Sequence, residues 1–190
     1  MDATAEELLR FWLDEVGPDG WYRVDEGLDA AIRDRWGALW EVARTGGLAG
    51  WKAAPRSWLA LIVLLDQFPR NMFRGGARAF ASDARALATA KVAILHGRDL
   101  KIGLPERQFF YLPLMHSEIQ TNQDKCVRLF LTSFGRDDGH VKHARAHREI
   151  IRRFGRFPYR NAALGRESTP EEVAFLEGGG YASLIKEMAA

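Results

Sequence analysis

The sequence predicts an all-α protein of about eight helices that pair as antiparallel hairpins. Apolar residues recur at the three- and four-residue spacing of amphipathic helices along most of the chain. No stretch alternates apolar and polar residues between hairpin turns, which argues against β-sheet. The 190 residues are 47% hydrophobic, and no low-complexity linker divides them. A single helical domain over residues 1–190 is therefore expected.

Start and stop signals place the helices of the first half. Thr4 and Glu7 have the spacing of a capping box, so the first helix is expected to begin there. Pro55 suits the first turn of a segment that is apolar almost all round, which is typical of a buried central helix. Pro69 is expected to stop that helix, because proline breaks the hydrogen-bond ladder. The expected ranges are 4–16, 29–44, 55–68 and 82–96.

The second half carries similar signals. Pro105 suits a first helical turn, and Pro113 is expected to kink or end the helix that follows. Thr169 and Glu172 form a second capping box, with a proline at the first helical position. The glycines at 178–180 separate a short terminal helix. The expected ranges are 105–115, 122–133, 139–154 and 170–176.

Composition excludes several classes of protein. Cys126 is the single cysteine, which rules out an internal disulfide framework, and it is expected to be a small core residue. The longest apolar run, Trp58–Leu65, is far shorter than the roughly 18 residues that cross a bilayer. A net charge of +2 without a recognisable nucleic-acid module argues against a nucleic-acid partner. The chain is expected to be soluble and cytoplasmic, with no membrane partner.

A short segment occurs twice. Phe-Pro precedes Arg70 and Asn71 at the first occurrence, and Arg160 and Asn161 at the second. Asp66 lies just before the first, on the buried helix, where a bare carboxylate would be costly. We expect an arginine from one of these turns to pair with Asp66. The pair fixes the helix end in one interpretation and contributes to a site in the other.

Three histidines lie on the apolar side of the helix expected over residues 139–154. His143 and His147 have the i, i+4 spacing that metal-binding helices use, yet too few further ligands accompany them to predict a metal or another cofactor. We interpret these histidines as core or cleft-lining residues. The opposite basic face, with Arg145 and Arg148, is interpreted as exposed to solvent.

His116 and Glu118 follow the bend expected at Pro113. Histidine titrates near neutral pH and a carboxylate can orient it, so a general-base pair is one interpretation. Polar capping of a helix end is the other. The sequence has no nucleophile-elbow, phosphate-loop or dinucleotide-binding motif.

These segments together resemble the bacterial "domain of unknown function 924" family. The resemblance rests on LLDQFPRNMFRG, on FFYLPLMHSE and on HREIIRRFGRFPYRNAALGRESTPEE. It implies stacked helix hairpins, a tetratricopeptide-repeat-like α/α superhelix with a concave face, and no established activity. Tyr159 departs from the family, where many relatives have histidine. The family motif maps onto Asp66, Gln67, Phe68, Pro69, Arg70, Asn71, His116, Ser117, Glu118, His147, Arg156, Phe157, Pro158, Arg160, Asn161 and Glu167.

Three functions are consistent with this sequence. The leading hypothesis is a binding module that holds a small anionic ligand or an acidic peptide, since arginine suits planar recognition of anions. The second is an enzyme of unknown reaction, in which His116 and Glu118 are catalytic while Arg160 and Asn161 stabilise negative charge. The third is a structural protein–protein scaffold. The ligand-binding candidates are Asp66, Arg70, Asn71, His147, Arg156, Arg160 and Asn161, with His116 as an additional anion ligand.

The oligomeric state is open. Tryptophans are the residues most suited to an exposed apolar contact, and a homodimer through such a contact is possible. The candidates for that contact are Trp21, Trp36 and Trp51.

Overall fold

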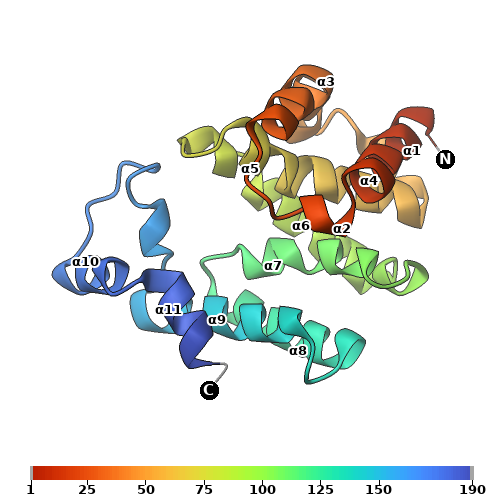
Figure 1. Cartoon of the computed structure of the whole chain (residues 1–190). Coiled ribbons are helices and arrows are strands. Elements are labelled where there is room, and N and C mark those ends of the chain that lie inside the picture. The colour runs from red at the N-terminus through yellow and green to blue at the C-terminus, as the bar shows by residue number, and fades with distance from the viewer. Residues whose placement is uncertain (1, 189–190) are drawn as a thin grey trace. The chain divides into compact units, whose positions relative to one another are not determined.

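A computed structural model of the chain describes residues 2–188 (Figure 1). Every regular element within them is helical and none is a strand, so the all-α class is confirmed. The fold divides into two compact units, residues 1–113 and residues 114–190, which we describe separately. The expectation of one domain over the whole chain stays a prediction. Among the helices of residues 2–188, none is both long enough and apolar enough to span a membrane.

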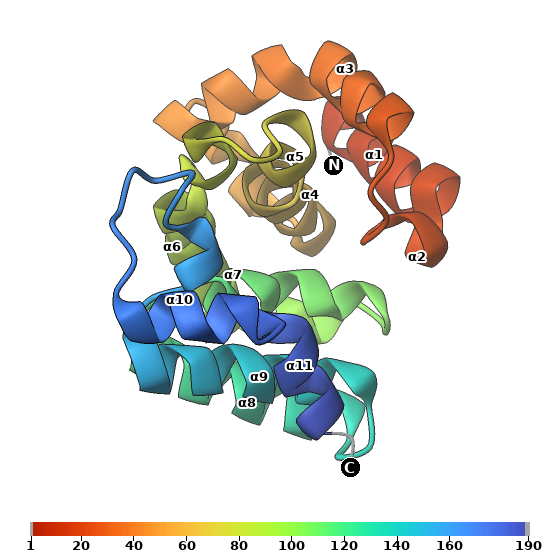
Figure 2. The same cartoon turned by 60° about the vertical axis from the view of Figure 1, so that its left-hand side comes forward.

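The first unit is built around a buried central helix. Helix α4 (Pro55–Asp66) exposes almost nothing from Ser57 onward, and it packs against α1, α3 and α6 (Figure 2). Phe68, directly after it, lies edge-on to Trp12 with ring centroids 5.4 Å apart. The other elements are α1 (Ala3–Leu9), a π-helix (Arg10–Val16), α2 (Gly17–Gly20), α3 (Glu26–Thr45), η2 (Ala49–Ala53), α5 (Phe68–Met72), η3 (Ala77–Phe80), α6 (Asp83–Leu95), η4 (Asp99–Lys101) and η5 (Glu106–Phe110).

Three expectations for the helices up to residue 115 were wrong. Helix α1 begins before Thr4, because the Asp2 carboxylate accepts hydrogen bonds from the backbone N–H groups of Thr4 and Ala5 and is the cap. Pro69 does not stop a helix but stands in the first turn of α5, where its missing N–H costs no hydrogen bond. The helix expected over residues 105–115 is instead two short elements, η5 and α7 (Leu112–Met115).

The second unit is a helical hairpin covered by shorter helices. Helices α8 (Gln120–Phe134) and α9 (Gly139–Phe154) run antiparallel, side by side in both views (Figures 1 and 2). The turn η6 (Pro158–Arg160) leads to α10 (Pro170–Glu177) and α11 (Gly180–Glu187), and α11 packs on α9. The Thr169 capping box is confirmed, with both of its reciprocal bonds to Glu172 formed. One buried apolar cluster joins α9 to the Phe-Pro turn and to α11, and it comprises Ala146, Ile150, Ile151, Phe157 and Leu184.

Burial corrects the expectation for the tryptophans. Trp21, Trp36 and Trp51 are all buried, with at most 6% of the residue exposed, so none offers an exposed contact for a second copy. Their indole rings belong to the core, since burying such large apolar groups contributes strongly to packing. Cys126 is buried as expected, and burial raises the pKa of its thiol.

Candidate functional site

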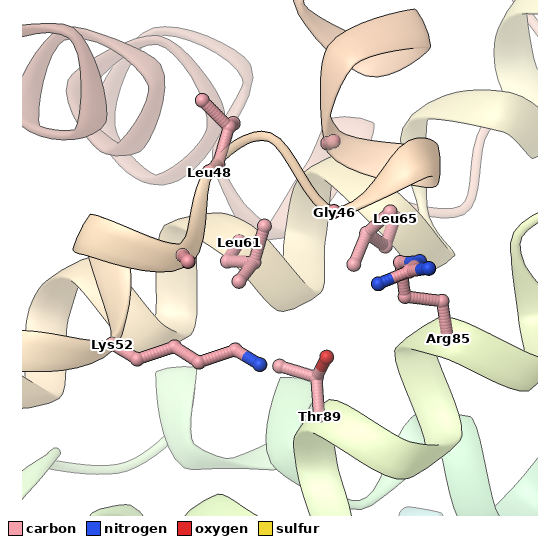
Figure 3. A pocket seen from close by; sticks show the side chains of 9 residues that line it. Gly46, Leu48, Lys52, Leu61, Leu65, Arg85 and Thr89 are labelled. Atoms are coloured by element: carbon pink, nitrogen blue, oxygen red, sulfur yellow. The ribbon is translucent and has the colours of Figure 1, made fainter.

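A small pocket opens in the first unit where α3 ends (Figure 3). Its volume is about 20 Å³, close to the space that one ordered water or one oxyanion group needs. Apolar side chains from three elements form much of its wall, and polar groups reach it from two sides. The lining residues are Ala43, Gly46, Leu48, Ala49, Lys52, Leu61, Leu65, Arg85 and Thr89.

The polar groups of this pocket come from η2 and α6. Lys52 reaches in from η2 beside Thr89, and Arg85 extends from α6 toward Gly46 (Figure 3). Within residues 2–188, neither cation has a carboxylate partner, although the Lys52 ammonium lies 5.6 Å from the centre of the Trp58 ring. The pocket therefore combines positive charge, one hydroxyl and an apolar wall.

A larger hollow, of about 240 Å³, lies in the second unit on the polar face of α9. Lys142, Arg145 and Arg148 line it together with Glu149 and Met188. Across the described part of the chain, Lys142 and Arg145 make no ion pair, and the nearest carboxylate oxygen to Arg148 belongs to Asp124 at 3.9 Å. The hollow thus gathers three cations that no carboxylate neutralises at hydrogen-bonding distance.

The one acidic residue of this hollow is already neutralised. Glu149 accepts hydrogen bonds from Arg152 at 2.6 and 2.7 Å and from Arg153 at 2.7 Å. The Arg152 hydrogen bonds, aided by Arg153, lower the pKa of Glu149 to about 2, so it stays ionised and paired. Glu149 is therefore paired with Arg152 and Arg153, and of the three lining cations only Arg148 has a carboxylate within 4 Å, that of Asp124 at 3.9 Å.

The sequence candidates of the first unit all bond to other residues of that unit. Asp66 is fully buried, accepts from the Gln67 amide at 2.5 Å, and lies 3.6 Å from the Arg70 guanidinium, as the Phe-Pro turn predicted. Arg70 also pairs with Asp83 at 3.1 Å. Asn71 donates to Asp29 at 2.8 Å.

Glu118 binds a guanidinium in the second unit. Arg166 donates to both of its oxygens, at 2.7 and 3.0 Å, and the Phe157 N–H donates at 2.8 Å. Burial alone would raise the pKa of Glu118, but these hydrogen bonds outweigh it and hold that pKa below its ordinary value. The carboxylate is thus committed to Arg166 and the Phe157 backbone rather than to orienting an imidazole.

Arg156 and Asn161 converge on the second capping box. Arg156 donates to both oxygens of Glu172, at 2.6 and 2.7 Å, and Asn161 donates to the same carboxylate at 3.2 Å. These contacts, the Arg156 hydrogen bond first among them, lower the pKa of Glu172 to about 2. Because Glu172 also closes the capping box, the Phe-Pro turn is joined to the start of α10.

The histidines meet around Phe157. The His147 ring lies 6.4 Å from that of His116 and 5.5 Å from Phe157, while the Arg160 guanidinium lies 4.6 Å above Phe157. His147 donates from Nδ1 to the His143 carbonyl at 2.9 Å, and burial lowers its pKa to about 3, so the ring is neutral. Among the described residues, no three His, Cys, Asp or Glu side chains are placed to hold a metal ion.

Sequence reasoning missed both hollows. The basic face of α9 is visible as a pattern in the sequence, but the hollow beside it is not, because Met188 comes from a distant segment. Nothing in the sequence marked Lys52, Arg85 and Thr89 as neighbours. Arg166, the partner of Glu118, was also missed, since no local spacing relates two residues so far apart.

Comparisons with known proteins give family and fold. Residues 8–180 match the family described as "Bacterial protein of unknown function (DUF924)". A solved structure from Agrobacterium tumefaciens, titled "Structure of Protein of Unknown Function ATU0120", is 41% identical with a TM-score of 0.88. The match covers 93% of this chain and 98% of that one. A search of curated proteins finds no match.

Proposed function

The chain belongs to the bacterial DUF924 family of unknown function, and we propose that it is a binding module for an acidic peptide segment of a partner protein. The hollow on α9 is the docking site. The carrying observation is that Lys142, Arg145 and Arg148 line a space of about 240 Å³ without a neutralising carboxylate at hydrogen-bonding distance.

The chemistry of this hollow favours a peptide over a simple ion. Cations spaced along a helix meet carboxylates spaced along an extended chain, and the stems of long basic side chains cover apolar groups of the ligand. Met188 adds a flexible apolar contact, a property that suits variable peptide side chains. The tetratricopeptide-repeat-like arrangement implied by the resemblance belongs to the same proposal, with α8 and α9 as one hairpin.

In this proposal the arginines of the Phe-Pro turns have a structural role. Arg70 pairs with Asp83 and Arg156 with Glu172, each inside its own unit. The alternative of an enzyme with His116 and Glu118 as a pair draws less support, because Glu118 binds Arg166. The proposal thus retains recognition of an anionic ligand, but assigns it to the cations of α9 instead of the arginines of the Phe-Pro turns.

The test is a binding titration with a fluorescein-labelled hexaglutamate peptide, followed by anisotropy at low salt. Each exposed ion pair contributes about 0.2–1 kcal/mol, so the loss of two pairs in Lys142→Glu/Arg145→Glu is expected to weaken binding by about two- to thirtyfold. Raising the salt concentration to 0.5 M is expected to weaken it further, since exposed charges are screened.

The matched control changes the same net charge elsewhere in the second unit. Arg136 is exposed and lies outside the hollow, so Arg136→Glu combined with Lys186→Glu is expected to retain most of the affinity. If both double variants lose the same affinity, the peptide responds only to the overall charge of the protein, and the proposed site is wrong.

A further inference from the structure

We propose that the acidic segment that docks in the α9 hollow is helix α10 of a second copy of this chain, so that two copies bind each other reciprocally as a dimer. This inference rests on the proposed function, because it names the occupant of the same hollow. A second copy is favoured because the chain itself carries an exposed acidic helix whose side-chain spacing matches that of the hollow.

Helix α10 exposes apolar side chains that its own unit leaves incompletely covered. Val173 and Leu176 are 40% and 37% exposed. The packed side of the helix holds Phe175, whose ring lies 5.0 Å from that of Phe154 in α9, and the buried Glu172. Because Val173 and Leu176 are three residues apart, they form a ridge on the helix surface that a second helix can cover.

Two carboxylates lie on the ridge next to the apolar one. Glu171 and Glu177 are exposed, and within residues 2–188 neither makes an ion pair. Ala174 lies halfway between them, so positions 171, 174 and 177 hold an acid, a small residue and an acid. With a rise of about 1.5 Å per residue, the two acidic positions are about 9 Å apart along the helix axis.

The α9 hollow presents the opposite charge at the same spacing. Lys142, Arg145 and Arg148 are also three residues apart on a helix, so the outer two positions are again about 9 Å apart along the axis. With the two ridges side by side, the carboxylates of α10 meet the outer two cations. The small side chain of Ala174 leaves room for Arg145, and the apolar ridge has Met188 as a neighbour. Charge and shape are thus complementary between copies.

Sedimentation velocity of the full chain at low salt tests the proposal, at about 10 μM to about 1 mM because small polar interfaces associate weakly. The average mass is expected to rise toward that of two chains with concentration and to fall when hexaglutamate is added. The mass of one chain at every concentration would overturn the inference, and if hexaglutamate still binds, the proposed function stands without it. A dimer that hexaglutamate does not dissociate would also overturn it, because the contact would then lie elsewhere.

Charge-swapped variants locate the contact. Lys142→Glu/Arg148→Glu and Glu171→Lys/Glu177→Lys are each expected to raise the dissociation constant at least about fourfold, because a reciprocal dimer loses four exposed ion pairs. An equimolar mixture of the two variants is expected to associate again, since each reversed surface finds its opposite charge on the other variant. A mixture that stays monomeric would refute the contact.

The matched control is Asp14→Lys/Asp19→Lys, which adds the same charge at exposed positions of the first unit and is expected to dimerise normally. An equal loss there would reduce the effect to net charge and overturn the proposal. Glu177→Lys alone guards against a double variant that does not fold, because lysine is favourable in the last turn of a helix. It is expected to weaken the dimer about twofold or more, and an unchanged dissociation constant would count as refutation.

Discussion

Arg166 binds Glu118 through two hydrogen bonds, of 2.7 and 3.0 Å, across 48 residues of chain. Glu118 stands at the start of the second unit and Arg166 follows its Phe-Pro turn. The same carboxylate accepts a hydrogen bond from the Phe157 N–H. Glu118 therefore joins the turn after α9 to the residues that precede α8. Glu118 and Phe157, two residues of the family motif, are thus held together with Arg166 in one hydrogen-bonded network.

Arg166→Ala is expected to destabilise the protein by about 2 kcal/mol, the usual range for hydrogen bonds to a charged group that is mostly shielded from water. The measurement is guanidinium unfolding followed by circular dichroism. A double-mutant cycle with Glu118→Gln tests the pairing. Additive losses in that cycle would mean that the two residues do not act together.

Asp66→Ala is expected to cost about 1–3 kcal/mol, because the buried Gln67 amide would lose its acceptor while Arg70 would keep Asp83 as a partner. Urea unfolding measures the difference. Asp14→Ala, on the exposed side of the first unit, is the matched control and is expected to change stability by less than about 0.5 kcal/mol. An unfolding midpoint for Asp66→Ala equal to the wild type would show that the pair contributes nothing.

Stability is expected to fall in acid through Glu172. Its pKa in the folded protein is about 2, below the ordinary value of 4.5, so the folded state binds its proton more weakly than the unfolded state. The contribution is complete above about pH 4.5 and is lost as the pH falls toward 2. Unfolding curves at pH 3 and pH 6 measure it. Glu172→Gln should show a smaller difference between these two curves, and an unchanged difference would contradict the assignment.

His147 is expected to remain neutral from pH 8 to pH 4. Burial lowers its pKa to about 3 against an ordinary 6.5, so the unfolded state takes up a proton first and stability declines as the pH falls below 6.5. The Hε1 chemical shift of His147, followed by NMR, should stay flat over this range. A sigmoidal titration with a midpoint near 6.5 would show that the ring is solvated.

Local signals were enough for most helices. The range 139–154 was predicted to the residue, and Ser82 and His96 cap α6 where the expected helix began and ended. The Thr169 box formed as predicted. Each of these signals involves residues within about one turn of each other, and the backbone bonds that they satisfy are equally local.

The identity of long-range partners came only from the tertiary structure. The sequence pointed to Glu118 as a partner of His116, yet its carboxylate binds Arg166. Which donor reaches Glu118 depends on how the Phe-Pro turn packs and not on distance along the sequence. Likewise, Asp2 rather than Thr4 caps α1, since both residues have suitable side chains and only the backbone path selects one.

By itself, the sequence determined that this chain folds into helices, where most of them begin and end, and that Asp66 needs a cationic partner. The tertiary structure alone decided which cations line a common hollow, namely Lys52 and Arg85 in the first unit and Lys142, Arg145 and Arg148 on α9. The physical reason is range: helix signals act between near neighbours, whereas a hollow exists only where side chains from separate segments fail to fill the space between them.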